Sequence, residues 1–160
     1  MNDRLYGLDK LYSVYDKYSK YDYIYVDDIS NYKIKRPNEF EASHGGICWD
    51  YMRPMSLAMH KNAFSHQCYF TELHKDNKTI ATHTYIIVND FDFYYWVECA
   101  WQKHKGVYLV FSYKDVERIL RNEYDADECY TVAYSPVKTE GMTADEFFKY
   151  LNNYGIKLWK

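Results

Sequence analysis

The stretch TIATHTYIIVNDFDFYYWVECAW, residues 79–101, decides the fold of this chain. β-branched and aromatic residues fill the runs 79–88 and 93–101, and the polar segment NDFD separates them. A third run, QCYFTELHK at 67–75, precedes them and is followed by the polar turn DNK. Such runs bounded by turn residues are typical of antiparallel strands. The sequence therefore predicts a three-stranded meander between residues 67 and 100.

Helical patterns precede this meander. Leucine and tyrosine recur at helical spacing over residues 4–20, which predicts an amphipathic helix. Pro37 interrupts the next segment, so we expect irregular structure between residues 27 and 46. A second helix is expected to begin near Cys48, and Pro54 predicts either a kink in it or the start of a further helix.

Strand and helix signals alternate after the meander. Ser112 and Thr143 each precede an apolar helical stripe, and Gly155 suits a helix C-terminus. Further strands are expected in the segments GVYLVF, ECYTVAY and IKLW, at residues 106–111, 128–134 and 156–159. The predicted fold class is α+β, with helices flanking an antiparallel sheet in a single domain that spans residues 1–160.

Composition excludes several classes of protein. The chain has 160 residues, of which 48% are hydrophobic, enough to bury a core. A net charge of −3 lacks the basic excess typical of nucleic-acid binding. The N-terminal MNDRLYGLDK is polar, and no apolar run is long enough to span a membrane. We therefore expect a cytoplasmic protein without nucleic-acid or membrane partners.

The thiols and imidazoles do not form metal motifs. The four cysteines, Cys48, Cys68, Cys99 and Cys129, contain no CxxC pair and are expected to be free thiols in a reducing cytosol. The six histidines form no HExxH motif and no pair with convincing ligand spacing. We therefore expect neither a metal nor a cofactor.

Cys48 follows a glycine pair in HGGICWDYM, residues 44–52, at a predicted helix start. A helix N-terminus favours a thiolate, and a backbone N–H there can face a developing oxyanion. Gly46 would let the backbone approach a substrate closely, and Trp49 is expected to pack the helix against the sheet. In the competing interpretation, Cys48 is a packing residue beside an aromatic ring.

His83 and Glu98 lie on neighbouring predicted strands. If NDFD is a four-residue hairpin loop, Val88 pairs with Phe93. His83 then lies directly opposite Glu98 on the same face, with Cβ atoms about 5 Å apart. A carboxylate at that distance holds an imidazole in one tautomer. Cys99 points to the opposite face and is expected in the core. An ordinary cross-strand polar pair is the competing interpretation.

The order of GGICWDY, His83 and Glu98 resembles the transglutaminase-like branch of the papain-like cysteine enzymes. That family carries a G-x-C-W/R-D-type motif at a helix start, a histidine on a later strand and an acid, usually Asp, on the next strand. Here the gaps between the three residues are 35 and 15, and the resemblance covers about residues 44–101. It departs from the pattern in having Glu98 without a following Pro, and Pro54 in the Cys-bearing helix. The HGGIC segment is also similar to the R-G-G-x-C motif of arylamine acetyltransferases, without its Arg.

The resemblance implies a papain/transglutaminase-like fold, in which the Cys-bearing helix packs on the antiparallel sheet. It also implies a triad of Cys48 as nucleophile, His83 as general base and acid, and Glu98 orienting the imidazole. Gly46 and Trp49 would then lie on the substrate or oxyanion side. The substrate would be a protein or peptide, or a small acyl donor and amine. Water as acceptor makes a hydrolase or deamidase, and an amine makes an acyltransferase. The alternative is an inactive protein-binding module related to phage or host-defence proteins.

Overall fold

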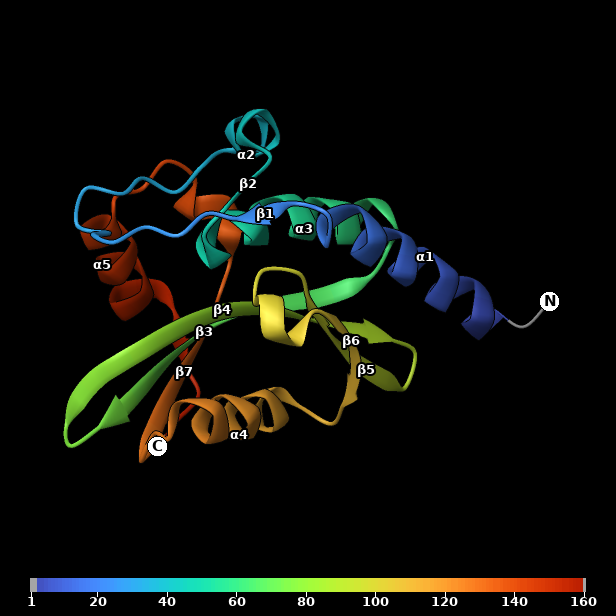
Figure 1. Ribbon diagram of the computed structural model, residues 1–160. Coiled ribbons are helices and arrows are strands. Elements are labelled where there is room, and N and C mark those ends of the chain that lie inside the picture. Colours follow the sequence, from blue (N-terminus) through green and yellow to red (C-terminus); the bar gives the residue numbers. More distant parts are fainter. Residues whose placement is uncertain (1–2, 160) are drawn as a thin grey trace.

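A six-stranded antiparallel sheet is the centre of the computed structural model, which describes residues 3–159, with side chains from Gly7 onward (Figure 1). Its strands follow the order β6-β5-β4-β3-β7-β8. Their bounds are β3 (Ser65–Lys75), β4 (Lys78–Asp90), β5 (Phe93–Glu98), β6 (Gly106–Val110), β7 (Glu128–Tyr134) and β8 (Ile156–Lys157). The predicted α+β class and the meander are therefore confirmed. Residues 1, 2 and 160 of the predicted domain lie outside the described residues.

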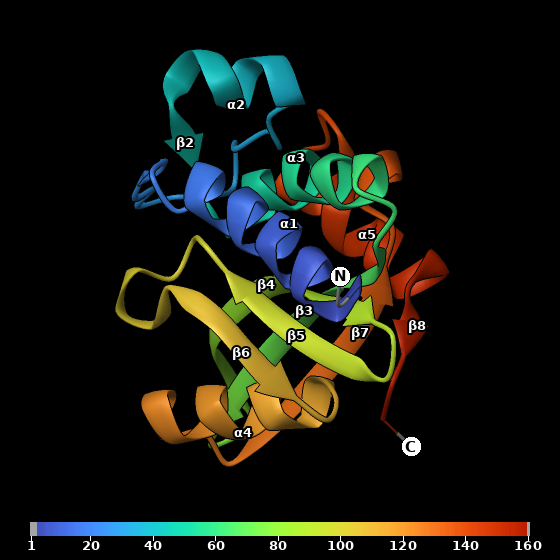
Figure 2. The same ribbon diagram turned by 90° about the vertical axis from the view of Figure 1, so that its right-hand side faces the viewer.

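Helices cover both faces of this sheet. They are α1 (Asp3–Tyr18), α2 (Pro37–Ser43), α3 (Cys48–Lys61), α4 (Tyr113–Tyr124) and α5 (Ala144–Tyr154), with short 3-10 turns η1 (Gln102–His104) and η2 (Pro136–Thr139). A second, parallel pair of short strands joins β1 (Asp22–Tyr23) to β2 (Gly45–Gly46). Figure 2 shows α1 and α3 over one face of the sheet and α4 over the other.

Each face of the sheet has its own hydrophobic core, because successive side chains of a strand alternate between the faces. On the α3 face, Met55 is buried with Ile86 and Val97 of the strands. On the α4 face, Leu120 is buried with Trp96. The predicted core position of Cys99 is confirmed, since it is buried in the cluster on the α3 face.

Local sequence signals fix the ends of the last two helices. The Ser112 hydroxyl accepts a hydrogen bond from the Lys114 N–H at 3.2 Å, so α4 begins as predicted. The Thr143 hydroxyl accepts one from the Glu146 N–H at 3.3 Å and caps α5, which ends at Gly155. The predicted starts of both helices and the predicted C-terminus of α5 are confirmed.

Two expectations about prolines need correction. Pro37 does not prevent regular structure, because it occupies the first turn of α2, where its missing N–H costs no helical hydrogen bond. The segment between residues 27 and 46 is thus partly helical. Pro54 lies inside α3, which continues from Cys48 to Lys61 as one helix, so no further helix starts there.

The hairpin between β4 and β5 is tighter than predicted. Asp90 pairs with Phe93, which leaves the two-residue turn Phe91–Asp92. Val88 therefore pairs with Tyr95, and its predicted pairing with Phe93 is wrong. Phe91 adopts a left-handed φ of 58°, which lets the chain reverse in so few residues. Because the register differs by two residues, every side chain keeps its predicted face.

Candidate active site

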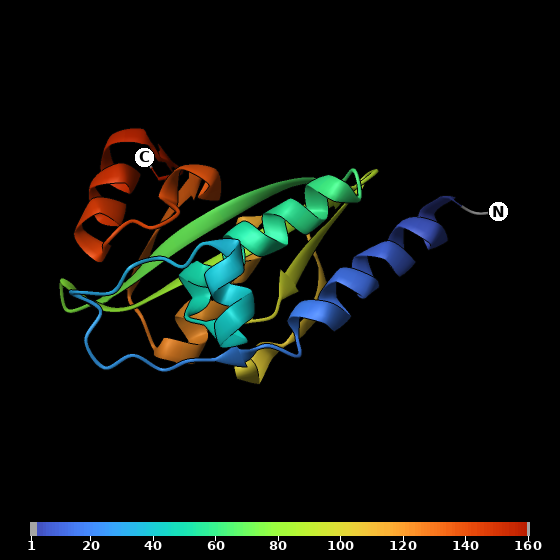
Figure 3. The same ribbon diagram turned by 90° about the horizontal axis from the view of Figure 1, so that it is seen from above.

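Cys48 is the first residue of α3, and this residue is 7% exposed. The N–H groups of a helix's first turn have no carbonyl partner within the helix, so this end carries partial positive charge. Figure 3 shows α2 close to this end of α3, and the two helices are in contact. The sequence prediction of a helix start at Cys48 is confirmed.

The glycine pair before Cys48 is required by close packing. Gly45 has a φ of +143°, and a Cβ there would lie 1.8 Å from the carbonyl oxygen of Asp22 in β1. A Cβ at Gly46 would lie 2.3 Å from Asp50 Oδ2. Both glycines are buried. The expectation that Gly46 offers an open surface to a substrate is therefore corrected: its lack of a side chain makes room for the Asp50 carboxylate.

Asp50 ties the start of α3 to the preceding loop. Its fully buried carboxylate accepts hydrogen bonds from the Tyr32 hydroxyl, the Lys35 N–H at 2.7 Å and the Ile47 N–H at 2.8 Å. Burial raises the pKa of the Asp50 carboxyl, and the three hydrogen bonds oppose that shift. Sequence reasoning missed this residue. The signal was an acid in the first helical turn, which can bond back to the residue before the helix.

Trp49 packs against α5, within the core cluster that α3 shares with the sheet. Its ring centroid lies 4.9 Å from that of Phe147 and 5.6 Å from that of Phe148. The side chain is 3% exposed, so its ring has no free face for a substrate. The ring of Trp49 therefore fixes the end of α3 against α5.

The predicted contact between His83 and Glu98 is present. Glu98 Oε1 accepts a hydrogen bond from His83 Nε2 at 2.5 Å, since a carboxylate can only accept. Glu98 Oε2 accepts two more, from the N–H groups of Ala100 and Trp101, at 2.9 Å each. Glu98 is 2% exposed and His83 is 7% exposed. The carboxylate is thus fixed by three donors.

The geometry of this contact is diagonal, where direct opposition was predicted. Pairing of β4 with β5 ends at Ile86 and Val97, so the register places Glu98 beside Tyr85, two residues from His83. Diagonal neighbours on a sheet face lie roughly 7–8 Å apart at their Cα atoms, within reach of a long side chain. The extra methylene of Glu, compared with Asp, spans that diagonal.

The side chain of Cys48 lies close enough to His83 to contribute to the pKa of its imidazole. Because Nε2 is taken by Glu98, the ring nitrogen left for the thiol is Nδ1. Burial lowers the pKa of His83, but the Glu98 charge and the Cys48 contact outweigh burial and raise the pKa to about 10. The structure thus brings Cys48, His83 and Glu98 together at one site, with His83 hydrogen-bonded to Glu98 and near the thiol of Cys48.

Aromatic rings enclose the imidazole. Tyr85 stacks on His83 with ring centroids 6.0 Å apart, and Trp101 lies at 5.5 Å. Trp101 in turn stacks on Tyr124 of α4 at 6.0 Å. Excluding water in this way strengthens the electrostatic interaction between His83 and Glu98. Sequence reasoning missed this enclosure, because the approach of Trp101 and Tyr124 depends on packing between elements distant in sequence.

The other three thiols lie in different surroundings. All four cysteines are free, as predicted. Burial raises the pKa of Cys68 and of Cys129 to about 12, and burial with the nearby Glu98 raises that of Cys99. These three thiols are therefore held in the protonated form, and Cys48 is the one beside an imidazole.

Comparison of the chain with protein-family models, curated proteins and solved structures finds no match. Within residues 3–159, no helix is long and apolar enough to cross a membrane. In the same part of the chain, no three His, Cys, Asp or Glu side chains group as metal ligands. The geometry around Cys48 therefore carries the functional argument.

Proposed function

We propose that this protein is a papain-like cysteine enzyme of the transglutaminase-like type, which acts on amide or thioester bonds through an acyl-enzyme. One observation carries the proposal: at the start of α3, His83 is hydrogen-bonded to Glu98 and lies near the side chain of Cys48. A Cys-bearing helix that packs on an antiparallel sheet agrees with the fold of that family.

The chemistry follows from the order of the three groups. His83 takes the proton of Cys48, and Glu98 stabilises the imidazolium that forms. The thiolate attacks the substrate carbonyl, and the Cys48 N–H donates to the oxygen that becomes negative. His83 then protonates the leaving amine or thiol. Water or an amine, deprotonated by His83, attacks the acyl-enzyme and releases the product.

The alternative is an inactive binding module on the same fold. It is favoured by the low exposure of Cys48, at 7%, which leaves little of the thiol open to a large substrate. In that case the triad would be a buried polar network that fixes α3 on the sheet, and its partner would be another protein.

Alkylation by iodoacetamide, followed at each cysteine by peptide mass spectrometry across pH, separates these functions. If the protein is an enzyme, Cys48 should be labelled below pH 7, and at least ~10-fold faster in the wild type than in His83→Ala, because only the thiolate reacts. Cys129 is the control, since it is the least buried of the other thiols. Labelling of Cys48 only near pH ~8.5 and above, as for an ordinary thiol, would favour the binding module.

A further inference from the structure

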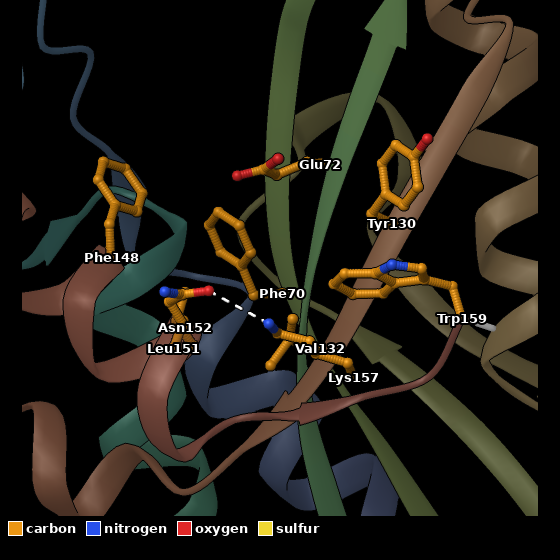
Figure 4. Close-up of a pocket in the computed structure, with 9 residues that line it drawn as sticks. All are labelled: Phe70, Glu72, Tyr130, Val132, Phe148, Leu151, Asn152, Lys157 and Trp159. Atoms are coloured by element: carbon orange, nitrogen blue, oxygen red, sulfur yellow. Dashed lines mark hydrogen bonds between the residues drawn. The ribbon is translucent and has the colours of Figure 1, made fainter.

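A cavity of about 320 Å³ opens between α5, β8 and the face of the sheet (Figure 4). Its lining comes from four elements: Phe70, Glu72, Tyr130, Val132, Phe148, Leu151, Asn152, Lys157 and, beyond β8, Trp159. Neither Cys48, His83 nor Glu98 belongs to it. The cavity is therefore a candidate ligand site separate from the proposed active site.

The floor and walls of this cavity are apolar and largely aromatic. Phe70, Val132 and Leu151 are buried in the core beneath it. The partly exposed ring of Trp159 stands edge-on to Tyr130, with centroids 5.2 Å apart. Flat apolar surfaces of this kind favour a ligand with a ring or a branched apolar body.

Charges of opposite sign lie at opposite corners of the floor. Glu72 of β3 pairs with Tyr130 of β7. Two residues further along β7, Val132 pairs with Lys157 of β8. Glu72 and Lys157 are thus separated by two strand spacings and one two-residue step, roughly 12 Å between Cα atoms. Both long side chains can reach inward over Val132. Figure 4 shows Glu72 at one end and Lys157 at the other.

Neither charge is neutralised by a permanently charged partner in the described chain. The Lys157 ammonium donates to the neutral amide oxygen of Asn152 at 3.2 Å. The Glu72 carboxylate contacts the His74 ring at 3.1 Å, through Oε2, which leaves Oε1 available. A ligand with only a positive charge would meet Lys157, and one with only a negative charge would meet Glu72.

We propose that this cavity binds a small zwitterion with an apolar body, of the aromatic amino acid class. Its ammonium group donates to Glu72 and its carboxylate accepts from Lys157, while its ring lies over Phe70 and Val132 beside Trp159. Charge-assisted hydrogen bonds to both charged groups, which an α-amino acid carries on one carbon, select for the zwitterion, and the apolar floor selects for the ring.

Isothermal titration calorimetry on the full chain tests the site with L-phenylalanine, phenethylamine and 3-phenylpropionate. The amine lacks the carboxylate and the acid lacks the ammonium group. We expect saturable binding of one L-phenylalanine per chain, and at least ~10-fold weaker binding of both analogues. Equal binding of either analogue, or no saturable binding of L-phenylalanine, would overturn the proposal.

Three variants locate the ligand. Glu72→Gln should weaken L-phenylalanine and phenethylamine but not 3-phenylpropionate, and Lys157→Met should weaken L-phenylalanine and 3-phenylpropionate but not the amine. Lys138→Met, at an exposed lysine outside the cavity, is the matched control and should leave all three unchanged. Cys48→Ser should also leave binding unchanged. Loss of binding in Cys48→Ser, or full binding in both cavity variants, would place the ligand elsewhere and refute the site.

Discussion

At the scale of single residues, Glu98 does two separate jobs. One oxygen holds the imidazole of His83, and the other holds the N–H groups of Ala100 and Trp101, where the chain leaves β5. The same side chain thus orients a proposed catalytic base and fixes the turn that carries Trp101 over it. Replacing it affects both the charge and the local backbone.

Removing the charge of Glu98 should change the titration of His83. The Glu98 carboxylate raises the pKa of His83, and burial lowers it. In Glu98→Gln only the effect of burial remains of these two, so the pKa of His83 should fall well below about 10. NMR titration of the His83 ring measures this. Glu72→Gln, next to His74, is the matched control and should leave His83 unchanged. An unaltered His83 titration in Glu98→Gln would contradict the coupling that the structure shows.

The same shift has a consequence for stability. A histidine whose pKa is raised on folding contributes stability fully below its ordinary pKa, about 6.5, and loses it as pH rises to about 10. The wild-type protein should therefore lose free energy of unfolding over this window, relative to Glu98→Gln. Denaturant titrations at pH 6 and pH 10 provide the comparison.

Residue-level prediction succeeded where only the face of a strand mattered. The alternation of side chains has a period of two, so the contact of His83 with Glu98 survives an error of two in register. The turn itself could not be predicted, because an aromatic residue such as Phe91 rarely adopts a left-handed φ. Asp50 was missed because its donors Tyr32 and Lys35 come from a loop without regular periodicity.

At the scale of elements, the position of α3 depends on contacts around its first turn. Gly46 in β2, Ile47 at the cap and Asp50 in the helix pack together without room for another atom. The proposed nucleophile is adjacent to this cluster in sequence. Its orientation is therefore linked to packing that lies outside the triad.

Gly46→Ala should destabilise the fold by about 2 kcal/mol, because the new methyl group would overlap the Asp50 carboxylate. Urea unfolding followed by circular dichroism measures the loss. Gly106→Ala is the control: its added Cβ would lie 3.1 Å from the Tyr108 ring, whose side chain can move aside, so the loss should be smaller. Wild-type stability in Gly46→Ala would show that the β2–α3 junction is looser than described.

Elements were predictable where their signals were local. Ser112 and Thr143 cap their own helices, so α4 and α5 could be located from a few neighbouring residues. Helix α2 could not be predicted in this way. It has only seven residues, and it begins with Pro37, a residue type that usually interrupts regular structure. The pairing of β1 with β2 joins segments 23 residues apart without a turn signal, and no sequence pattern marks it.

At the scale of the whole molecule, one sheet supports two cores. Met55→Ala on the α3 face and Leu120→Ala on the α4 face should each cost about 2–5 kcal/mol, since both side chains are fully buried. Each variant should shift a single unfolding transition, because both cores share the strands. Leu109→Ala, 64% exposed at the sheet edge, is the control. Separate transitions for the two faces would refute the single cooperative domain.

The topology of the sheet was less predictable than its strands. The meander from β3 to β6 follows sequence order, which local turns specify. The place of β7 beside β3 requires the chain to pass over the sheet as α4, and nothing in the apolar pattern of residues 128–134 indicates which edge they join. Antiparallel edges of similar character compete for such a strand, and tertiary packing decides between them.

The place of β7 also bears on how fast the chain folds. Thr71 and Thr131 are hydrogen-bonded at 2.7 Å although 60 residues separate them in sequence. Closing a loop of that length costs about 2 kcal/mol more conformational entropy than closing one of roughly five residues. The hairpins of β3, β4 and β5 can therefore form early, and we expect the joining of β7 to β3 to be the slowest step of folding. Until it occurs, one side of β3 is an unpaired edge, and the newly made chain is most exposed to mispairing with its neighbours.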